Sequence, residues 1–101
     1  MSEIEVRFSA EVFEWRGPAP FYFAAIDGAA AAQIKSVSAF ASYGWGCIQV
    51  AATLGKTSWT TALIPKDGRY LLPLKDKIRK AEGLDVGNRI RARVTVSLAQ
   101  M

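Results

Sequence analysis

The chain has 101 residues, of which half are apolar and 22% are charged, and its formal net charge is +4. This balance excludes a disordered chain, and the length suits one domain with its own core. Because the chain has no histidine and a single cysteine, histidine-based catalysis, histidine metal sites and internal disulfides are excluded too. We therefore expect no metal and no cofactor.

The first predicted element is a half-buried strand. Apolar and polar residues alternate from Glu3 to Val12, which is the period of a strand with one face in a core. The side chains expected inside are Ile4, Val6, Phe8, Ala10 and Val12. The adjacent apolar pair Val12-Phe13 predicts a shift of register, and Gly17-Pro18-Ala19-Pro20 predicts the end of the strand.

A short aromatic strand over 21–26 and a helix come next. Asp27 suits a helix N-cap, and the alanine-rich stretch after Gly28 has high helix propensity. We expect a helix of about three turns that ends before Ser42. Its buried side chains are expected to be Ile34, Val37 and Phe40.

The clearest predicted hairpin follows. Apolar residues alternate from Ile48 to Leu54, Gly55-Lys56 suits a two-residue turn, and a threonine-rich strand returns over 57–64. Residues 65–68 predict a second turn, which leads into a short strand over 69–72.

A second helix is predicted from Leu74 to Glu82, between Pro73 and Gly83. Its buried stripe is expected to be Leu74, Ile78 and Ala81. The last strand alternates from Arg89 to Leu98. Short alternating strands with two short helices indicate a mainly β fold, a small closed barrel whose helices plug it. We expect a single β-barrel domain over 1–101.

Neither end carries a targeting signal, and no apolar run is long enough to cross a bilayer. We expect a cytoplasmic protein that does not bind membranes.

Several short motifs follow one another along the chain. They are Gly44-Trp45-Gly46, Ser58-Trp59-Thr60-Thr61-Ala62-Leu63-Ile64-Pro65, Asp67-Gly68-Arg69-Tyr70, Leu71-Leu72-Pro73-Leu74, Ile78-Arg79-Lys80-Ala81 and Val86-Gly87. In this combination the chain resembles the uncharacterised prokaryotic domain-of-unknown-function family numbered nineteen-oh-five. The resemblance implies a double-split β-barrel, distantly like the fold of AbrB-type transition-state regulators and MazE-type antitoxins. It does not imply their DNA binding, because fold does not fix function.

No catalytic motif is present. Gly55-Lys56-Thr57 is similar to the end of a phosphate-binding loop, but Val50 stands where that motif needs a glycine. Cys47 has no histidine to activate its thiol, and its place in an alternating strand favours a packed side chain. We expect no catalytic residues, and a protein that is not an enzyme.

The basic residues gather in one segment. Lys66 to Arg93 contains nine of the thirteen basic residues and four of the nine acidic ones. Its last three arginines share one face of the final strand: Arg89, Arg91 and Arg93. If the terminal strands pair antiparallel, Glu3 or Glu5 stands opposite this row and forms ion pairs with it. The alternative is an anion-binding or nucleic-acid surface.

Two further features point to a binding site. Arg79 lies beside the buried stripe, where its guanidinium bonds a backbone carbonyl or a carboxylate, or else holds an anion. Tyr43 and Trp45 lie in or beside a glycine-containing loop, and large aromatics in a loop suit a cover for a ligand. Core packing is the alternative for these aromatics.

The leading hypothesis is a non-enzymatic binding module for a small anionic or aromatic ligand. The residues expected to line its cleft are Tyr43, Trp45, Lys66, Arg69, Tyr70 and Arg79. One alternative is a nucleic-acid-binding protein that uses the basic 66–93 segment, for which the modest net charge predicts only weak, nonspecific binding. Another is a structural or interaction domain. The sequence predicts neither the identity of the ligand nor an oligomeric state.

Overall fold

The computed structural model describes residues 2–15, 21–38, 42–43 and 47–98. These residues form seven strands and two helices. In chain order they are β1 (Ser2–Trp15), β2 (Phe21–Ile26), α1 (Gly28–Ser36), β3 (Ser42–Tyr43), β4 (Cys47–Leu54), β5 (Thr57–Lys66), β6 (Arg69–Pro73), α3 (Asp76–Glu82) and β7 (Arg89–Leu98). The predicted mainly β class with two short helices is confirmed.

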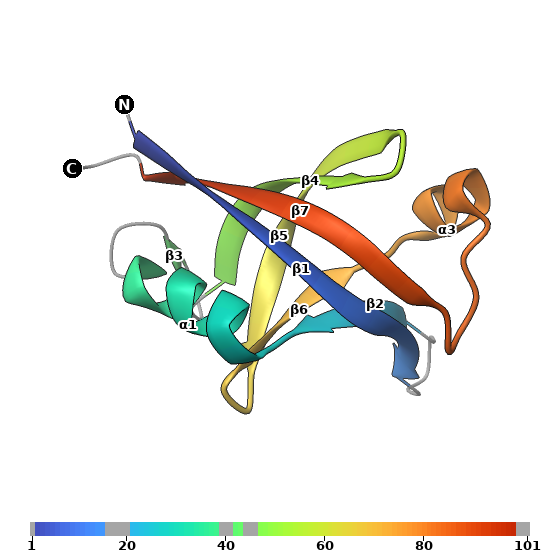
Figure 1. Cartoon of the computed structure of the whole chain (residues 1–101), viewed down its shortest axis with the longest axis horizontal. Helices are drawn as coiled ribbons and strands as arrows, with labels where there is room; N and C mark the ends of the chain where they lie inside the picture. The colour runs from blue at the N-terminus through green and yellow to red at the C-terminus, as the bar shows by residue number, and fades with distance from the viewer. Residues whose placement is uncertain (1, 16–20, 39–41, 44–46, 99–101) are drawn as a thin grey trace.

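Six of the described strands close into a barrel (Figure 1). Their order is β4-β5-β6-β2-β1-β7, every neighbouring pair is antiparallel, and β7 pairs with β4 as well as with β1. The short β3 pairs with the beginning of β4, before the residues of β4 that pair with β7. The predicted closed, double-split β-barrel is therefore confirmed.

The alternation of the terminal strands builds much of the core. Val6 lies opposite Val94, and Ala10 lies opposite Ile90. All four side chains are buried, and full burial of a valine or isoleucine stabilises a fold by about 1.5 to 3 kcal/mol. The inward face predicted for the two strands is confirmed for the described side chains.

At Val12 the first strand changes partners. Glu11 still lies opposite Arg89 in β7, whereas Val12 lies opposite Ala24 in β2. The N–H of Val12 donates to the carbonyl of Asn88 at 2.9 Å. β1 thus continues to Trp15, and the irregularity in its alternation marks the passage from one partner to the next.

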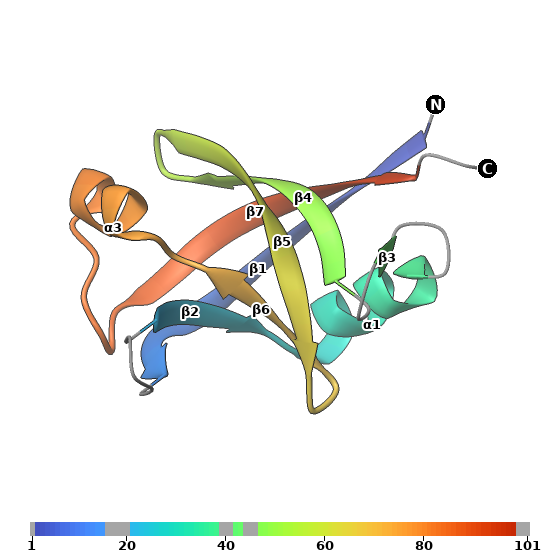
Figure 2. The same cartoon turned by 180° about the vertical axis from the view of Figure 1, so that it is seen from behind.

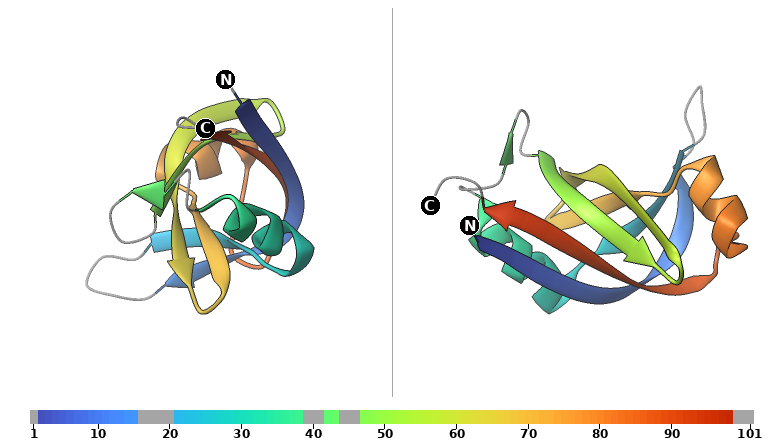
Figure 3. Two further views of the ribbon diagram at one scale, coloured as in Figure 1. Left: turned by 90° about the vertical axis from the view of Figure 1, so that its left-hand side faces the viewer. Right: turned by 90° about the horizontal axis from the view of Figure 1, so that it is seen from above.

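The two helices lie at opposite ends of the barrel (Figures 2 and 3). In α1, Ala31 and Ile34 are buried, and Val37, directly after the helix, packs against the core. Asp27 holds the N-cap position as predicted, although its side chain makes no capping hydrogen bond. Phe40 lies outside the described residues.

The second helix begins later than predicted. The N–H of Leu74 donates to the carbonyl of Tyr22 at 2.8 Å, so this residue bonds to β2 and α3 starts at Asp76. Ile78 is buried, but Ala81 is exposed, and its assignment to the buried stripe was wrong. Gly83 has φ 63° and ends the helix. Leu84, which follows it, packs against the core instead of Ala81. Neither described helix is long and apolar enough to span a membrane.

Candidate functional site

The side chains predicted to line one cleft lie in more than one place. Lys66, Arg69 and Tyr70 line a hollow of about 410 Å³ beside α1, although Tyr70 is only 5% exposed and belongs to the core. Arg79 lines a different hollow of about 510 Å³, between β2 and α3. The side chain of Tyr43 and the whole of Trp45 lie outside the described residues.

A third hollow, of about 470 Å³, adjoins the other two. It shares Phe21, Phe23 and Ile64 with the hollow at Arg79, and Pro65 and Lys66 with the hollow beside α1. We call the two hollows that share Phe21 the aromatic groove. Its principal lining residues are Trp15, Phe21, Tyr22, Phe23, Ile64, Lys66 and Arg79.

Pairing between β1 and β2 brings the aromatic rings of the groove together. Trp15 lies opposite Phe21, and Phe13 lies opposite Phe23. The Phe23 ring is central: its centroid lies 6.0 Å from that of Phe13, 6.3 Å from that of Trp15 and 6.5 Å from that of Phe21. These are ordinary separations for interacting aromatic rings. The groove is therefore backed by one continuous aromatic cluster.

The outer part of this cluster is open. Phe21 is 60% exposed, Trp15 41% and Ile64 38%. Among the described residues, only Val86 is another large hydrophobic side chain with comparable exposure. Such a concentration of exposed apolar area is typical of a binding surface.

Two cations contact rings of the groove. The Nζ of Lys66 lies 4.3 Å from the centre of the Trp15 ring, which is cation–π distance. Within the described part of the chain Lys66 forms no ion pair. Its charge is therefore available to an anionic group beside the tryptophan.

Arg79 is held more firmly. Its guanidinium carbon lies 3.7 Å from the centre of the Tyr22 ring. Its Nε donates to the carbonyl of Leu74 and its terminal nitrogen to a carboxylate oxygen of Asp76, both at 3.1 Å. The structural use expected for Arg79, on a carbonyl or a carboxylate, is confirmed on both partners. Asp76 also forms an ion pair with Lys80 at 3.2 Å, as the helix spacing indicates.

A second basic site lies where β1 pairs with β7. The two strands are antiparallel as expected, but Glu3 faces Ser97 and Glu5 faces Thr95. Neither glutamate therefore stands directly opposite an arginine of the row, but Glu5 lies 4.0 Å from Arg93 on the other strand, so the expected cross-strand ion pair is confirmed for Glu5. Of the row, only Arg89 has a glutamate opposite it, Glu11.

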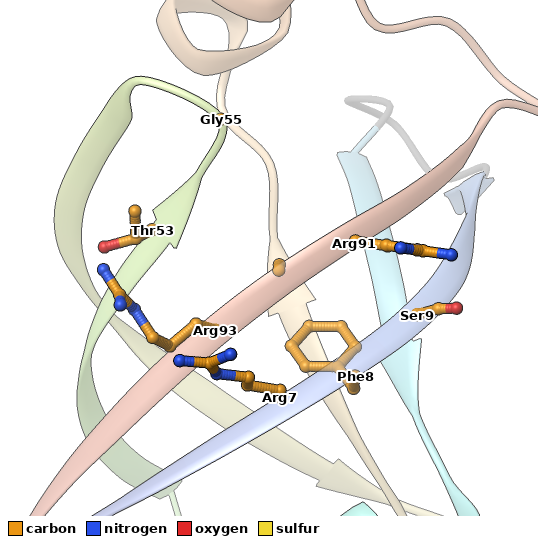
Figure 4. A pocket seen from close by; sticks show the side chains of 8 residues that line it. Arg7, Phe8, Ser9, Thr53, Gly55, Arg91 and Arg93 are labelled. Atoms are coloured by element: carbon orange, nitrogen blue, oxygen red, sulfur yellow. The ribbon is translucent and has the colours of Figure 1, made fainter.

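The residues opposite the other two arginines make a groove. Arg7 lies opposite Arg93, and Ser9 lies opposite Arg91. They line a hollow of about 610 Å³ that we call the arginine groove (Figure 4). Its lining residues are Arg7, Phe8, Ser9, Thr53, Gly55, Arg91, Ala92 and Arg93. Arg89 is not among them, and Arg7 is a site residue that sequence reasoning missed.

No group of three histidine, cysteine, aspartate or glutamate side chains that would suit a metal ion occurs within the described ranges. Cys47, at the beginning of β4, is half-buried. The absence of a metal, of a cofactor and of a catalytic residue stays a prediction.

Comparison with known proteins places the chain in a family. No curated protein matches the chain. One family model does match, over residues 8–96, and its description is Domain of unknown function (DUF1905). The match includes both helices and at least part of each strand in the barrel. The chain therefore belongs to the DUF1905 family.

Proposed function

We propose that this domain is a non-enzymatic binding module whose site is the aromatic groove. Its ligand is a small molecule with a flat aromatic body and one anionic group. The observation that supports this proposal best is the pairing of the exposed Trp15 with Lys66, whose Nζ lies 4.3 Å from the ring centre. An aromatic ligand stacks on the ring while the ammonium group attracts its anion.

The size and the lining of the groove favour a small ligand. Each of its two hollows measures about 500 Å³, within the range of small-molecule sites. Trp15 and Phe21 lose most of their solvent contact when a ring covers them, and each square ångström of apolar surface buried contributes about 25 cal/mol. Arg79 is engaged with Asp76 and Leu74, so Lys66 is the residue that selects the anion.

Two other functions receive less support. Nucleic-acid binding through the basic 66–93 segment would draw on its arginine row, but Arg89 faces Glu11 and Arg93 lies 4.0 Å from Glu5. A purely structural or interaction domain does not require an exposed tryptophan beside a lysine that has no described ion-pair partner. A cytoplasmic location belongs to the same proposal and rests on the single cysteine of the chain.

The test is a calorimetric titration with two probes of equal shape. One probe is 2-naphthoate, which carries a carboxylate, and the other is 2-naphthamide, which is neutral. We expect saturable binding of both probes. Naphthoate should bind more tightly by about tenfold, because one charge-assisted hydrogen bond contributes about that factor in affinity. Lys66→Gln should remove this difference and leave the affinity for naphthamide within about twofold.

Phe21→Ala and Val86→Ala form a matched pair for the apolar part of the site. Both remove an exposed hydrophobic side chain, but only Phe21 lines the groove. The proposal requires Phe21→Ala to weaken both probes and Val86→Ala to weaken neither. Equal effects of the two variants would show adsorption to any apolar surface and would contradict it.

A further inference from the structure

The arginine groove places like charges directly opposite one another. Arg7 and Arg93 are cross-strand neighbours, and Thr53 of β4 is the next neighbour of Arg93. Like charges in this relationship destabilise a sheet. A negative charge beside both arginines relieves this repulsion.

Part of that charge comes from Glu5. One carboxylate oxygen of Glu5 lies 3.0 Å from Nε of Arg7, and the other lies 4.0 Å from a terminal nitrogen of Arg93. All three side chains are solvent-accessible, with 44% of Glu5 and 43% of Arg93 exposed. One carboxylate thus serves two guanidinium groups, and a stronger oxyanion has access to both.

The other end of the groove has no described acidic partner. Arg91 faces Ser9 across the strand pair and forms no ion pair with any residue in the described ranges. In Figure 4 the side chains of Arg7 and Arg93 extend toward the Thr53 side, whereas Arg91 extends to the end marked by Ser9. Phe8 lies between the two ends along β1 and also lines the hollow, although its side chain packs against the core.

We propose that the arginine groove binds a compact phosphorylated small molecule. Its phosphoryl group is held by Arg7 and Arg93 in place of Glu5, and the rest of the ligand extends along the strand pair to Arg91. Guanidinium groups match phosphate oxygens with paired hydrogen bonds, and the hydroxyls of Ser9 and Thr53 add donors. This site shares no lining residue with the aromatic groove.

The acidic residues around the groove favour a compact ligand over a nucleic acid. Along β1 the groove residues Arg7 and Ser9 are bounded by Glu5 on one side and by Glu11 on the other. A polyanion that followed the strand would meet these carboxylates, whereas a ligand that fits within about 610 Å³ would not.

The experiment is an NMR titration of the full chain with inorganic pyrophosphate at low ionic strength. We expect saturable shifts confined to the amides of the groove residues on β1, β4 and β7. Arg93→Ser should weaken binding by about tenfold or more, the worth of a charge-assisted hydrogen bond. Arg89→Ser is the matched control, because it removes the same charge from the same strand outside the groove, and binding should stay within about twofold.

Glu5→Gln tests whether the carboxylate of Glu5 competes with the ligand for the two arginines. It removes the internal competitor for Arg7 and Arg93, so pyrophosphate should bind severalfold more tightly. Thermal melts establish that each variant is folded, and Arg7→Ser replaces Arg93→Ser if the latter does not fold.

Three outcomes would overturn the proposal. The first is shifts that do not saturate, and the second is an equal loss of affinity in Arg89→Ser and Arg93→Ser. The third is tighter binding of a single-stranded DNA of about 20 nucleotides than of pyrophosphate near 150 mM salt. The fall of this affinity with salt would then correspond to several neutralised phosphates. That last result would assign the face to nucleic acid.

Discussion

Arg79 in α3 lies over the ring of Tyr22 in β2, with its guanidinium carbon 3.7 Å from the ring centre. The same guanidinium donates to the carbonyl of Leu74 and to Asp76. A helix of seven residues is too short to be stable by itself. The side chain of Arg79 therefore connects α3 both to the barrel and to its own first turn.

The first prediction concerns this connection. Arg79→Ala removes a cation–π contact and two hydrogen bonds from a side chain that is only 22% exposed, so it should lower the free energy of unfolding by about 1 to 3 kcal/mol. Urea denaturation monitored by circular dichroism measures this loss. Lys77→Ala, at an exposed position of the same helix, should change stability by less than about 0.5 kcal/mol. A loss of similar size in both variants would mean that helix propensity, not these contacts, holds α3.

The second prediction concerns the turn between β4 and β5. Gly55 has φ +59°, and a Cβ at this position would collide with the carboxylate of Glu82, which accepts a hydrogen bond from Thr57. Gly55→Ala should therefore destabilise the fold twice, by about 1 to 2 kcal/mol for the left-handed backbone and by about another 1 kcal/mol for the disturbed hydrogen bond.

A double-mutant cycle separates the two costs. In a Glu82→Ala background, Gly55→Ala should cost only the backbone strain, so the two substitutions should be non-additive by about 1 kcal/mol. Additive losses in chemical denaturation would show that Glu82 does not restrict this position.

The fold was largely predictable because each terminal strand carries a regular pattern. Alternation fixes which side chains of β1 and β7 face inward, and Gly55-Lys56 fixes the register of its hairpin through Leu54 and Thr57. Alternation does not fix the register between strands that are distant in the sequence. Registers that differ by two residues all keep Val6 inside, and the alternating pattern does not distinguish between them. The position of Glu5 relative to the arginines could therefore not be predicted.

The same limit explains what was missed in the sites. Arg7 carries no motif, and its importance follows only from its position opposite Arg93. Lys66 and Arg79 were predicted as site residues from their charge and neighbours. The aromatic groove between them depends on the pairing of Trp15 with Phe21, on either side of a proline-containing segment where the pattern gives no register.

The third prediction concerns Trp59, which lies opposite Ala52 in β4 and packs against the core. Its indole N–H is buried and has no hydrogen-bond partner within the described structure. Trp59→Ala should cost about 3 kcal/mol, the lower end for such a truncation because the residue is only half-buried.

Trp59→Phe distinguishes packing from polarity at this position. It keeps an aromatic ring beside Ala52 and removes the unpaired N–H, so the cost should be below about 1 kcal/mol. Guanidinium denaturation of both variants provides the comparison. A loss in Trp59→Phe as large as that in Trp59→Ala would contradict this prediction, because the phenyl ring would then not replace the contribution of the indole.

The last prediction concerns closure of the barrel. β7 pairs with β1 on one side and with β4 on the other, and it contributes Ile90, Ala92, Val94 and Val96 to the core. Deleting Ile90 to Met101 should therefore open the barrel, leave β1 and β4 with unpaired backbone groups, and abolish cooperative unfolding. Thermal melts followed by circular dichroism and by tryptophan fluorescence measure this, with the full chain as the control. A truncated chain that kept one sharp transition, coincident by both probes, would mean that the remaining strands form a core without β7.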